Sequence, residues 1–209
     1  MARPRTFDED EVLRAVQEKF WDRGYAATSL SDIMQASGLG KGSIYASFGD
    51  KDAIFSRVFG IYCDRVTDAV REALGGPEDS AFERLRDFLA TAATGSQGSV
   101  AQRACFLAKT TAELAAHRPD IAERSRRAFT DLAGAITRCV TQAQRAGDID
   151  PEADPAQLGH YLLAVFRGLE ALAESGFADR AMLDAVTVAM NTLASVRVTP
   201  RQDAELGAR

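Results

Sequence analysis

Apolar residues recur every three to four positions along most of the chain, and this spacing is the period of amphipathic helices. We find no convincing run with the strict alternation of a half-buried strand. The pattern therefore predicts an all-α protein. Its first helix is expected to begin with Asp8 as N-cap and to stop at Gly24. A short second helix, capped by Thr28 or Ser29, is expected to end at Gly38.

A third short helix begins in an unusual way, with a lysine between two glycines in the stretch LGKGSIYASF that runs from Leu39 to Phe48. Glycine is a poor helix former. Such an entrance therefore suits a helix whose backbone must come close to another molecule. A long fourth helix is expected to be capped by Asp50 and to run to about Leu74, where Gly75-Gly76-Pro77 breaks it.

The helical pattern becomes longer and richer in alanine after this break. We expect further helices over 78–94, 101–117, 119–146, 155–175 and 179–196. The last segment, TPRQDAELGAR, has no apolar face and is expected to be frayed. The whole pattern predicts three short helices, a long connecting helix and then a bundle of long helices.

Composition agrees with an ordinary globular protein. The length of 209 residues suits one or two domains, and 46% of the residues are hydrophobic and 26% charged. No apolar run reaches membrane-spanning length, and the polar start MARPRTFDED lacks the apolar core of a signal peptide. We therefore expect a cytoplasmic protein without a membrane partner.

Cysteine and histidine are too few and too scattered for a metal centre. The three cysteines, Cys63, Cys105 and Cys139, are far apart and odd in number, which argues against a disulfide framework and a zinc site. The only two histidines are His117 and His160. A cysteine enzyme that uses Cys105 and one histidine is an alternative, but no third orienting group is apparent. We expect no metal, no cofactor and no catalytic residues.

The charge balance speaks against a nucleic-acid partner at first sight. The net charge is −5, and the first 52 residues carry seven lysines and arginines against nine aspartates and glutamates. Six of these nine lie on the predicted first helix or at its start. A case for DNA binding must therefore rest on where the positive charges lie.

The second and third predicted helices, joined by a short glycine turn, have the outline of a helix-turn-helix. In this motif the second helix enters the major groove with its N-terminal residues leading. Lys41 and Ser43 would then face the groove, while Ile44 and Phe48 pack inward. Short helices with a glycine turn also occur in many other helical proteins, so a purely structural interpretation stays open at this point.

Several residues around this motif are placed to meet phosphates. A helix N-terminus binds anions through its backbone N–H groups and its dipole. A basic arm ahead of the first helix can reach a phosphate or a neighbouring minor groove. The expected phosphate contacts are Thr28, Ser29, Tyr45 and Lys51, with Arg3 and Arg5 as the arm.

From Thr6 to about Phe59 the sequence resembles the DNA-binding domain of TetR-family transcriptional regulators. The resemblance is carried by FWDRGYAATSLSDIMQASGLGKGSIYASFGDKDAIF. It departs from the family pattern at Gly40 and at Ala46-Ser47, which can remove a phosphate contact without altering the fold. The DNA-contacting positions that the resemblance implies are Thr28, Lys41, Gly42, Ser43, Tyr45 and Lys51.

The resemblance also implies a function and a division of the chain. It implies a homodimeric repressor that binds a palindromic DNA operator and leaves it when a small-molecule effector binds. The parts would be a helix-turn-helix domain over 1–49, a helical effector-binding and dimerisation domain over 50–198 with the connecting helix over 50–74, and a disordered tail over 199–209. The last two helices would pair with their partner copies through Leu162, Phe166, Leu169, Met182, Val186, Met190 and Leu193.

An effector pocket is expected among the helices before that pair. Its predicted lining is Phe59, Tyr62, Cys63, Phe88, Cys105, Phe106, Lys109, Glu113 and Phe129. Such residues are more often packing than ligand contacts. Cys105 also lies where a subgroup of the family carries a sensing cysteine, so a thiol-based sensor of electrophiles or oxidants is an alternative.

Overall fold

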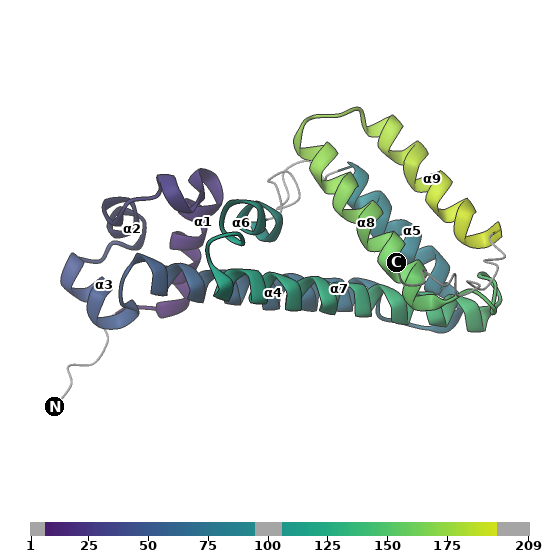
Figure 1. The fold of residues 1–209 in the computed structure, drawn as a ribbon, viewed down its shortest axis with the longest axis horizontal. Helices are drawn as coiled ribbons and strands as arrows, with labels where there is room; N and C mark the ends of the chain where they lie inside the picture. The colour runs from purple at the N-terminus through teal and green to yellow at the C-terminus, as the bar shows by residue number, and fades with distance from the viewer. Residues whose placement is uncertain (1–6, 95–105, 196–209) are drawn as a thin grey trace, which may run out of the picture. The chain divides into compact units, whose positions relative to one another are not determined.

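A computed structural model describes residues 7–94 and 106–195 of the chain. The predicted contacts Arg3, Arg5 and Cys105, and the predicted tail over 199–209, lie outside these residues. The described ranges contain helices and no strand (Figure 1). The helices are α1 Glu9–Ala27, α2 Leu30–Ser37, α3 Lys41–Phe48, α4 Lys51–Leu74, a 3₁₀ turn η1 Glu78–Ser80, α5 Ala81–Thr94, α6 Phe106–Leu114, α7 Pro119–Ala146, α8 Pro155–Glu174 and α9 Asp179–Ser195.

The predicted fold class is confirmed, and most helix ends lie within one or two residues of the prediction. The helix predicted over 119–146 is α7 itself. The helix predicted over 101–117 is shorter in the structure, because α6 ends at Leu114 and a turn follows. In the described part of the chain, no helix is long and apolar enough to cross a membrane.

Local capping explains where the first helices begin and end. The Asp8 carboxylate accepts hydrogen bonds from the backbone N–H of Asp10 at 2.9 Å and of Glu11 at 3.2 Å, so α1 begins there. Gly24 interrupts α1 with φ of 78° and ψ of 171°, a region that only glycine adopts easily. The predicted stop at Gly24 is thus a break, after which one more turn leads to Ala27.

The cap of α2 is Ser29. Its hydroxyl accepts from the backbone N–H of Asp32 at 3.2 Å, and the Asp32 carboxylate accepts from the backbone N–H of Ser29 at 2.8 Å. This reciprocal pair is a capping box. The hydrogen bonds from Ser29 lower the pKa of Asp32. Gly38 ends α2 in the left-handed conformation, as predicted.

The chain forms two compact units, which we describe separately. Unit 1 consists of Met1–Asp68 with Arg103–Phe129. It holds α1 to α3, the first part of α4, α6 and the start of α7. Its core is aromatic: Phe55 lies edge-on to Phe20 with ring centroids 4.8 Å apart, and Phe106 lies edge-on to Tyr62 at 5.3 Å. Aromatic pairs in this geometry add to the stability that burial supplies.

Unit 2 consists of Ala69–Gln102 with Thr130–Arg209. Helices α5, α8 and α9 pack against one another in it. Its core uses smaller side chains than the core of unit 1, among them Leu89, Ala143 and Met190. Close helix packing is visible at Gly159, where an added Cβ would lie 2.1 Å from the Thr137 hydroxyl. A larger residue at this position would force α7 and α8 apart.

The residues predicted for dimerisation do not form an outer surface. All seven are at most 8% exposed in the single chain, because the most apolar stripe of each helix packs into the chain's own bundle. The exposed faces of α8 and α9 carry other apolar side chains. The large ones are Tyr161, Leu172, Leu183 and Val188.

Candidate nucleic-acid interface

Helix α3 separates an inward from an outward face. Ile44 is fully buried and Phe48 is 7% exposed, so both anchor the helix to the core of unit 1. Tyr45 is 49% exposed, and Lys41 and Ser43 are exposed as well. The predicted inward and outward residues of this helix are therefore placed as expected. The outward face presents one cation and two hydroxyl groups.

The two glycines at the start of α3 are not required by the chain itself. An added Cβ at Gly40 or Gly42 meets no atom of the described chain within 4 Å. Neither glycine has a positive φ, since Gly40 lies at −71° and Gly42 is within the helix. Packing and conformation would therefore both accept alanine. The small size of these residues is consistent with close approach by another molecule.

Aromatic rings orient the two lysines. The Lys41 Nζ atom lies 5.9 Å from the centroid of the Tyr45 ring, and the Lys51 Nζ atom lies 4.1 Å from that of the Tyr25 ring. Cation–π contacts of this kind restrict a lysine without neutralising its charge. Both ammonium groups remain able to meet a phosphate.

Thr28 differs from the other predicted contacts because it is fully buried. Its hydroxyl donates to the Gly24 carbonyl oxygen at 2.7 Å and thereby ties the last turn of α1 to the break. In this structure the Thr28 side chain does not face solvent. Ser29 is the exposed residue of this pair, and its hydroxyl also donates to the Asp32 carboxylate at 2.6 Å.

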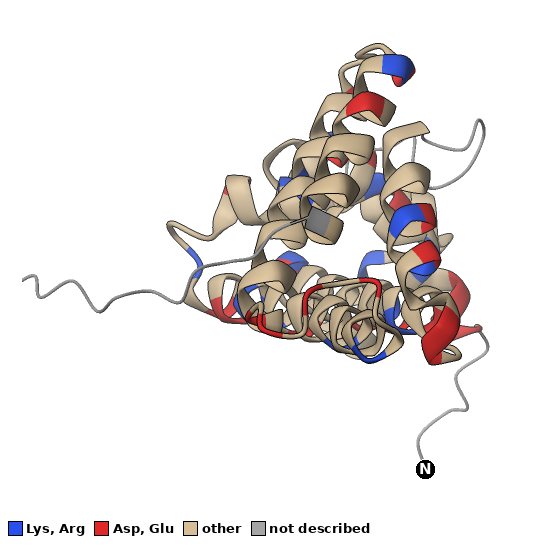
Figure 2. Ribbon diagram, turned by 90° about the vertical axis from the view of Figure 1, so that its right-hand side faces the viewer, with Lys and Arg blue, Asp and Glu red and all other residues tan. Residues whose placement is uncertain are grey.

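Two of the acidic residues at the start of α1, Asp8 and Glu9, make contacts within the chain, which weakens the charge objection. The acidic start of α1 is visible as a red stretch beside the N-terminal trace (Figure 2). Asp8 caps α1, and Glu9 pairs with Arg57 of α4. None of these residues is on α3. The negative balance of the first 52 residues therefore does not describe the face that α3 presents.

Helix α6 holds the end of α1 through a single carboxylate. Glu113 accepts hydrogen bonds from the backbone N–H of Tyr25 at 3.0 Å and of Ala26 at 2.8 Å. These N–H groups follow the break at Gly24 and have left the regular helix pattern. An added Cβ at Gly24 would lie 3.0 Å from a Glu113 carboxylate oxygen. The glycine thus allows both the break and the close approach of the carboxylate.

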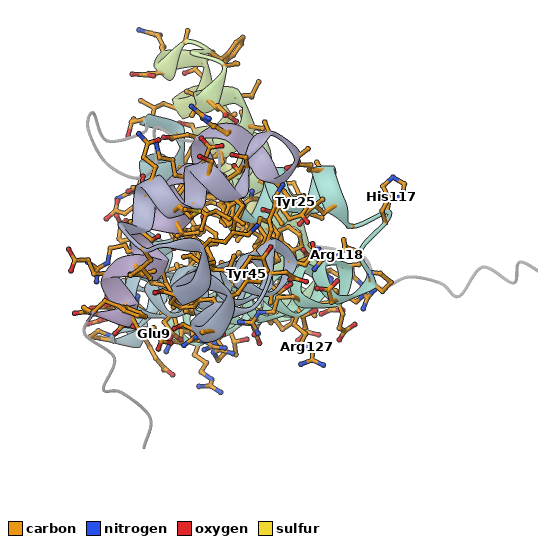
Figure 3. The ribbon with its side chains drawn as sticks, turned by 90° about the vertical axis from the view of Figure 1, so that its left-hand side faces the viewer. Glu9, Tyr25, Tyr45, His117, Arg118 and Arg127 are labelled. Carbon is orange, nitrogen blue, oxygen red and sulfur yellow. The ribbon has the colours of Figure 1, made fainter. Side chains whose placement is uncertain are left out.

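A second link joins the start of α7 to the start of α4. The Arg118 guanidinium donates to Asp52 at 2.6 Å, to the Ser56 hydroxyl at 2.9 Å and to Asp120 at 2.9 and 2.8 Å. Its hydrogen bonds to Asp120 lower the pKa of that carboxyl to about 2. Tyr25 lies beside Arg118 (Figure 3).

The tyrosine completes this polar network. The Tyr25 hydroxyl donates to Asp52, and partial burial together with this bond raises the pKa of Tyr25 to about 12. Sequence reasoning did not identify Arg118 or this role of Tyr25. No spacing rule points to them, since their shared partner Asp52 lies 27 positions from Tyr25 and 66 from Arg118 along the chain. Glu113 was predicted as a ligand contact, and the structure shows it bound to backbone N–H groups.

The structure divides the predicted effector lining between the two units. In unit 1, Phe59, Tyr62, Cys63 and Phe106 are buried in the aromatic core. Lys109 and Glu113 line a hollow of about 490 Å³ beside Trp21 and Gly24. Phe88 belongs to unit 2, and Phe129 is half-buried.

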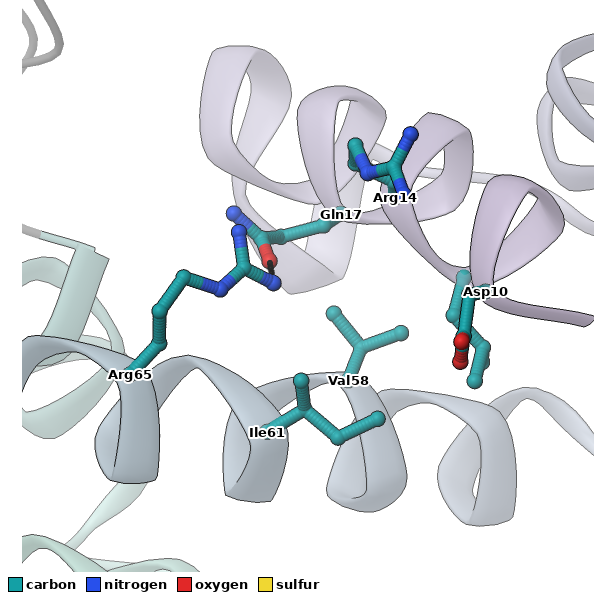
Figure 4. Close-up of a pocket in the computed structure, with 7 residues that line it drawn as sticks. Asp10, Arg14, Gln17, Val58, Ile61 and Arg65 are labelled. Carbon is teal, nitrogen blue, oxygen red and sulfur yellow. Dashed lines mark hydrogen bonds between the residues drawn. The ribbon is translucent and has the colours of Figure 1, made fainter.

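A further pocket lies between α1 and α4, with a volume of about 420 Å³ (Figure 4). The Arg65 guanidinium donates to the Gln17 side-chain oxygen across it at 3.3 Å. Asp10 and Arg14 lie at its edge. None of the predicted effector residues lines this pocket. The described residues also contain no group of three or more acidic, histidine or cysteine side chains arranged to hold a metal.

An exposed polar helix start, held on a small aromatic core behind a glycine turn, is the arrangement of a helix-turn-helix. Comparison with known families agrees. Residues 12–58 match the model for bacterial regulatory proteins of the tetR family, and residues 81–191 match that for the tetracyclin repressor-like C-terminal domain. The chain belongs to the TetR family of DNA-binding transcriptional regulators.

Individual relatives support this assignment. The chain is 30% identical to the HTH-type transcriptional repressor ComR of Escherichia coli K12 over 83% of each chain. It has the fold of a CifR cysteine mutant complexed with 26-base-pair double-strand operator DNA, with 22% identity, a TM-score of 0.73 and coverage of 92% and 100%. Reduced NemR of E. coli aligns with 16% identity, a TM-score of 0.76 and coverage of 90% and 98%.

Proposed function

We propose that this regulator is a homodimeric repressor that binds a palindromic operator and leaves it when a small molecule binds. The observation that carries the DNA-binding part is the start of α3, where two glycines have no internal requirement and Lys41 and Ser43 are exposed. ComR, its relative, is a repressor, which favours repression as the direction of control. We place its action in the cytoplasm.

Each contact residue has a distinct role in this proposal. Lys41, Gly42 and Ser43 approach the base edges, with the glycine allowing the backbone to come close. Tyr45, Lys51 and Ser29 bind phosphates, which fixes the position of α3 in the groove. Thr28 supports these contacts by anchoring the turn before α2. Arg3 and Arg5 are proposed as a basic arm toward a flanking phosphate or minor groove.

The proposed dimer face is the exposed side of α8 and α9. Leu172, Leu183 and Val188 are apolar and exposed there. Ala164 and Gly168 are small exposed residues one turn apart on α8, and an added Cβ at Gly168 meets nothing in the described chain within 4 Å. Pairing of this face with a second copy would bury apolar area and generate the symmetry that a palindromic site requires.

Release from DNA needs a connection between effector binding and α3. Glu113 and Arg118 supply one within unit 1, because they hold the end of α1 and the start of α4 from α6 and α7. A movement of α6 or α7 would shift both ends and thereby the elements that carry α3. An effector empties the operator only if it prefers the released conformation by several kcal/mol.

The test is selection of bound sequences from a randomised duplex pool, with Lys41→Ala and Tyr45→Phe variants. Arg138→Ala, at an exposed position of α7, is the control for loss of one positive charge. We expect a palindromic site whose binding is weakened in the two α3 variants and unchanged in the control. Affinity should fall by roughly three orders of magnitude between about 50 and 200 mM salt if six or more phosphates are contacted. Absence of any enriched sequence from a folded dimer would refute the proposal.

The alternative of a thiol-based sensor rests on Cys105, which lies outside the described residues. The other two cysteines are buried, and burial raises the pKa of the Cys139 thiol. This environment suits packing rather than reaction with oxidants. A Cys105→Ser variant that keeps operator binding but loses its response to an electrophile would favour the sensor over a non-covalent effector.

A further inference from the structure

The pocket between α1 and α4 in unit 1 is built from two kinds of side chain (Figure 4). Its apolar wall is formed by Leu13 and Val58, which are buried, and by Ile61, which is 37% exposed. The polar side chains of the lining are Asp10, Arg14, Gln17 and Arg65. Its volume of about 420 Å³ is that of a site for a small organic molecule. The pocket therefore suits a ligand with an apolar body and a polar end.

Gln17 is the buried polar side chain of this pocket. It is only 3% exposed, and its side-chain oxygen accepts a hydrogen bond from Arg65 at 3.3 Å. Among the described residues, none accepts a hydrogen bond from the side-chain NH2 group of Gln17. An amide NH2 group carries two donors, and a donor withdrawn from water without an acceptor costs free energy. A ligand in the pocket that accepts from this group would remove that cost.

The two arginines give the lining an excess of positive charge. Neither Arg14 nor Arg65 forms an ion pair with any residue that the structure describes. The bond from Arg65 to Gln17 has an uncharged acceptor, so the guanidinium keeps its full charge. Asp10 is the acidic residue of the lining, and Figure 4 shows it at the opposite end of the pocket from Arg65. The lining thus carries two positive charges against one negative charge, and a single anion neutralises it.

We propose that this pocket binds small amphipathic carboxylates, with Arg65 and the Gln17 NH2 group as donors to the carboxylate and Arg14 as a second positive charge. A guanidinium presents its N–H donors in a fork that matches the two oxygens of a carboxylate. The apolar body of the ligand covers Val58 and Ile61 and removes the exposed part of Ile61 from water. A dianion such as a phosphate monoester leaves the lining with an excess of negative charge. This inference goes beyond the proposed function and does not depend on it, because the whole site belongs to unit 1 and its test needs no operator.

The experiment uses four probes that share one phenylbutyl group: phenylpentanoate, phenylbutyl phosphate, phenylbutanol and phenylbutylammonium. Binding of each probe to the full chain is measured by titration calorimetry at one low ionic strength, since salt screens exposed charges. We expect phenylpentanoate to bind most tightly, the alcohol to bind about tenfold or more weakly, and the ammonium probe to show no detectable binding. The phosphate ester should bind about threefold or more weakly than phenylpentanoate. This ranking is measured on the wild type, so it does not depend on the folding of any variant.

Three substitutions test whether phenylpentanoate binds in this pocket. Arg65→Gln removes the guanidinium at the carboxylate and should lower the affinity about tenfold or more. Arg14→Gln should lower it only about threefold, because Arg14 is exposed and contributes mainly charge. Gln17→Glu keeps the shape of the side chain but replaces its NH2 donors by a carboxylate oxygen that pairs with Arg65. Since this carboxylate takes the place of the ligand's own, we expect Gln17→Glu to abolish detectable binding.

The matched control is Arg126→Gln, which removes the same charge from an exposed position of unit 1 outside the pocket. Its ion-pair partner Glu123 keeps a second arginine, Arg127. The affinity for phenylpentanoate should be unchanged in this variant, and circular dichroism checks that each variant is folded. Tightest binding by another probe, or no binding by any probe, would overturn the proposal. A folded Arg65→Gln variant that loses no more affinity than the control would overturn it as well.

Discussion

Glu113 of unit 1 and Glu170 of unit 2 are the same side chain in opposite surroundings. Glu113 is exposed, and its two oxygens accept hydrogen bonds from two backbone N–H groups. Glu170 is half-buried, and its carboxylate forms an ion pair with Arg167 of the same helix. Glu113 therefore joins two helices through its hydrogen bonds, whereas Glu170 is held by an arginine of its own helix. This contrast distinguishes a link between helices from an ion pair within one helix.

The largest expected effect on stability is at Gly24, which lies against Glu113. Gly24→Ala places a Cβ in a conformation that only glycine adopts easily and brings it to 3.0 Å from Glu113. We expect a loss of about 2–4 kcal/mol in the free energy of unfolding, measured by urea denaturation. Gly38→Ala is the control, since Gly38 also has a positive φ but no atom within 4 Å of the added Cβ. The Gly38→Ala substitution should lower the free energy of unfolding by about 1–2 kcal/mol. Equal losses would show that the contact with Glu113 adds no strain.

The next effect concerns the pH dependence of unit 2. The pKa of Glu170 is about 7 in the folded chain, against 4.5 for an ordinary glutamate. Because the folded pKa is raised, its contribution to stability is complete below pH 4.5 and is lost as the pH rises through 7. As the pH rises from about 4.5 to 8, the free energy of unfolding of Glu170→Gln should therefore increase by on the order of 2–3 kcal/mol relative to that of the wild type. Denaturation curves across this range test it, and parallel curves for the two proteins would contradict it.

A smaller effect is expected from the second link in unit 1. Arg118→Met removes the donors to Asp52, Ser56 and Asp120. We expect a loss of about 1 kcal/mol at neutral pH, since Asp52 and Asp120 are largely exposed. Arg118 depresses the pKa of Asp120. The stability from this pair is therefore present above about pH 4 and lost as the pH falls through 2, so the difference between variant and wild type should shrink in acid. A difference that grows in acid would exclude this origin.

The smallest effect on stability is expected at α3. Tyr45→Phe removes one exposed hydroxyl, so its unfolding free energy should stay within about 0.5 kcal/mol of wild type. If the hydroxyl binds a phosphate, operator affinity should fall by roughly threefold to tenfold. Fluorescence anisotropy with the selected operator measures this. Unchanged affinity would remove Tyr45 from the proposed contacts.

The sequence by itself determined the helices and their order. Caps such as Asp8, the glycine at position 38 and the break after Leu74 act through neighbouring backbone groups, so they can be read locally. The inward and outward residues of α3 were also predictable, because Ile44 and Phe48 share one face of a short helix. These features depend on interactions within a few residues.

Only the tertiary structure decided which apolar stripe is covered and where each carboxylate lies. Helices α8 and α9 carry two apolar faces, and local pattern cannot tell the one that packs on α5 from the one left exposed. The partners of Glu113 lie 88 and 87 positions away, and Glu170 lines a pocket together with residues of α4 and α5. Such contacts form only when helices that are distant in the sequence pack together, so they cannot be predicted from a local sequence pattern.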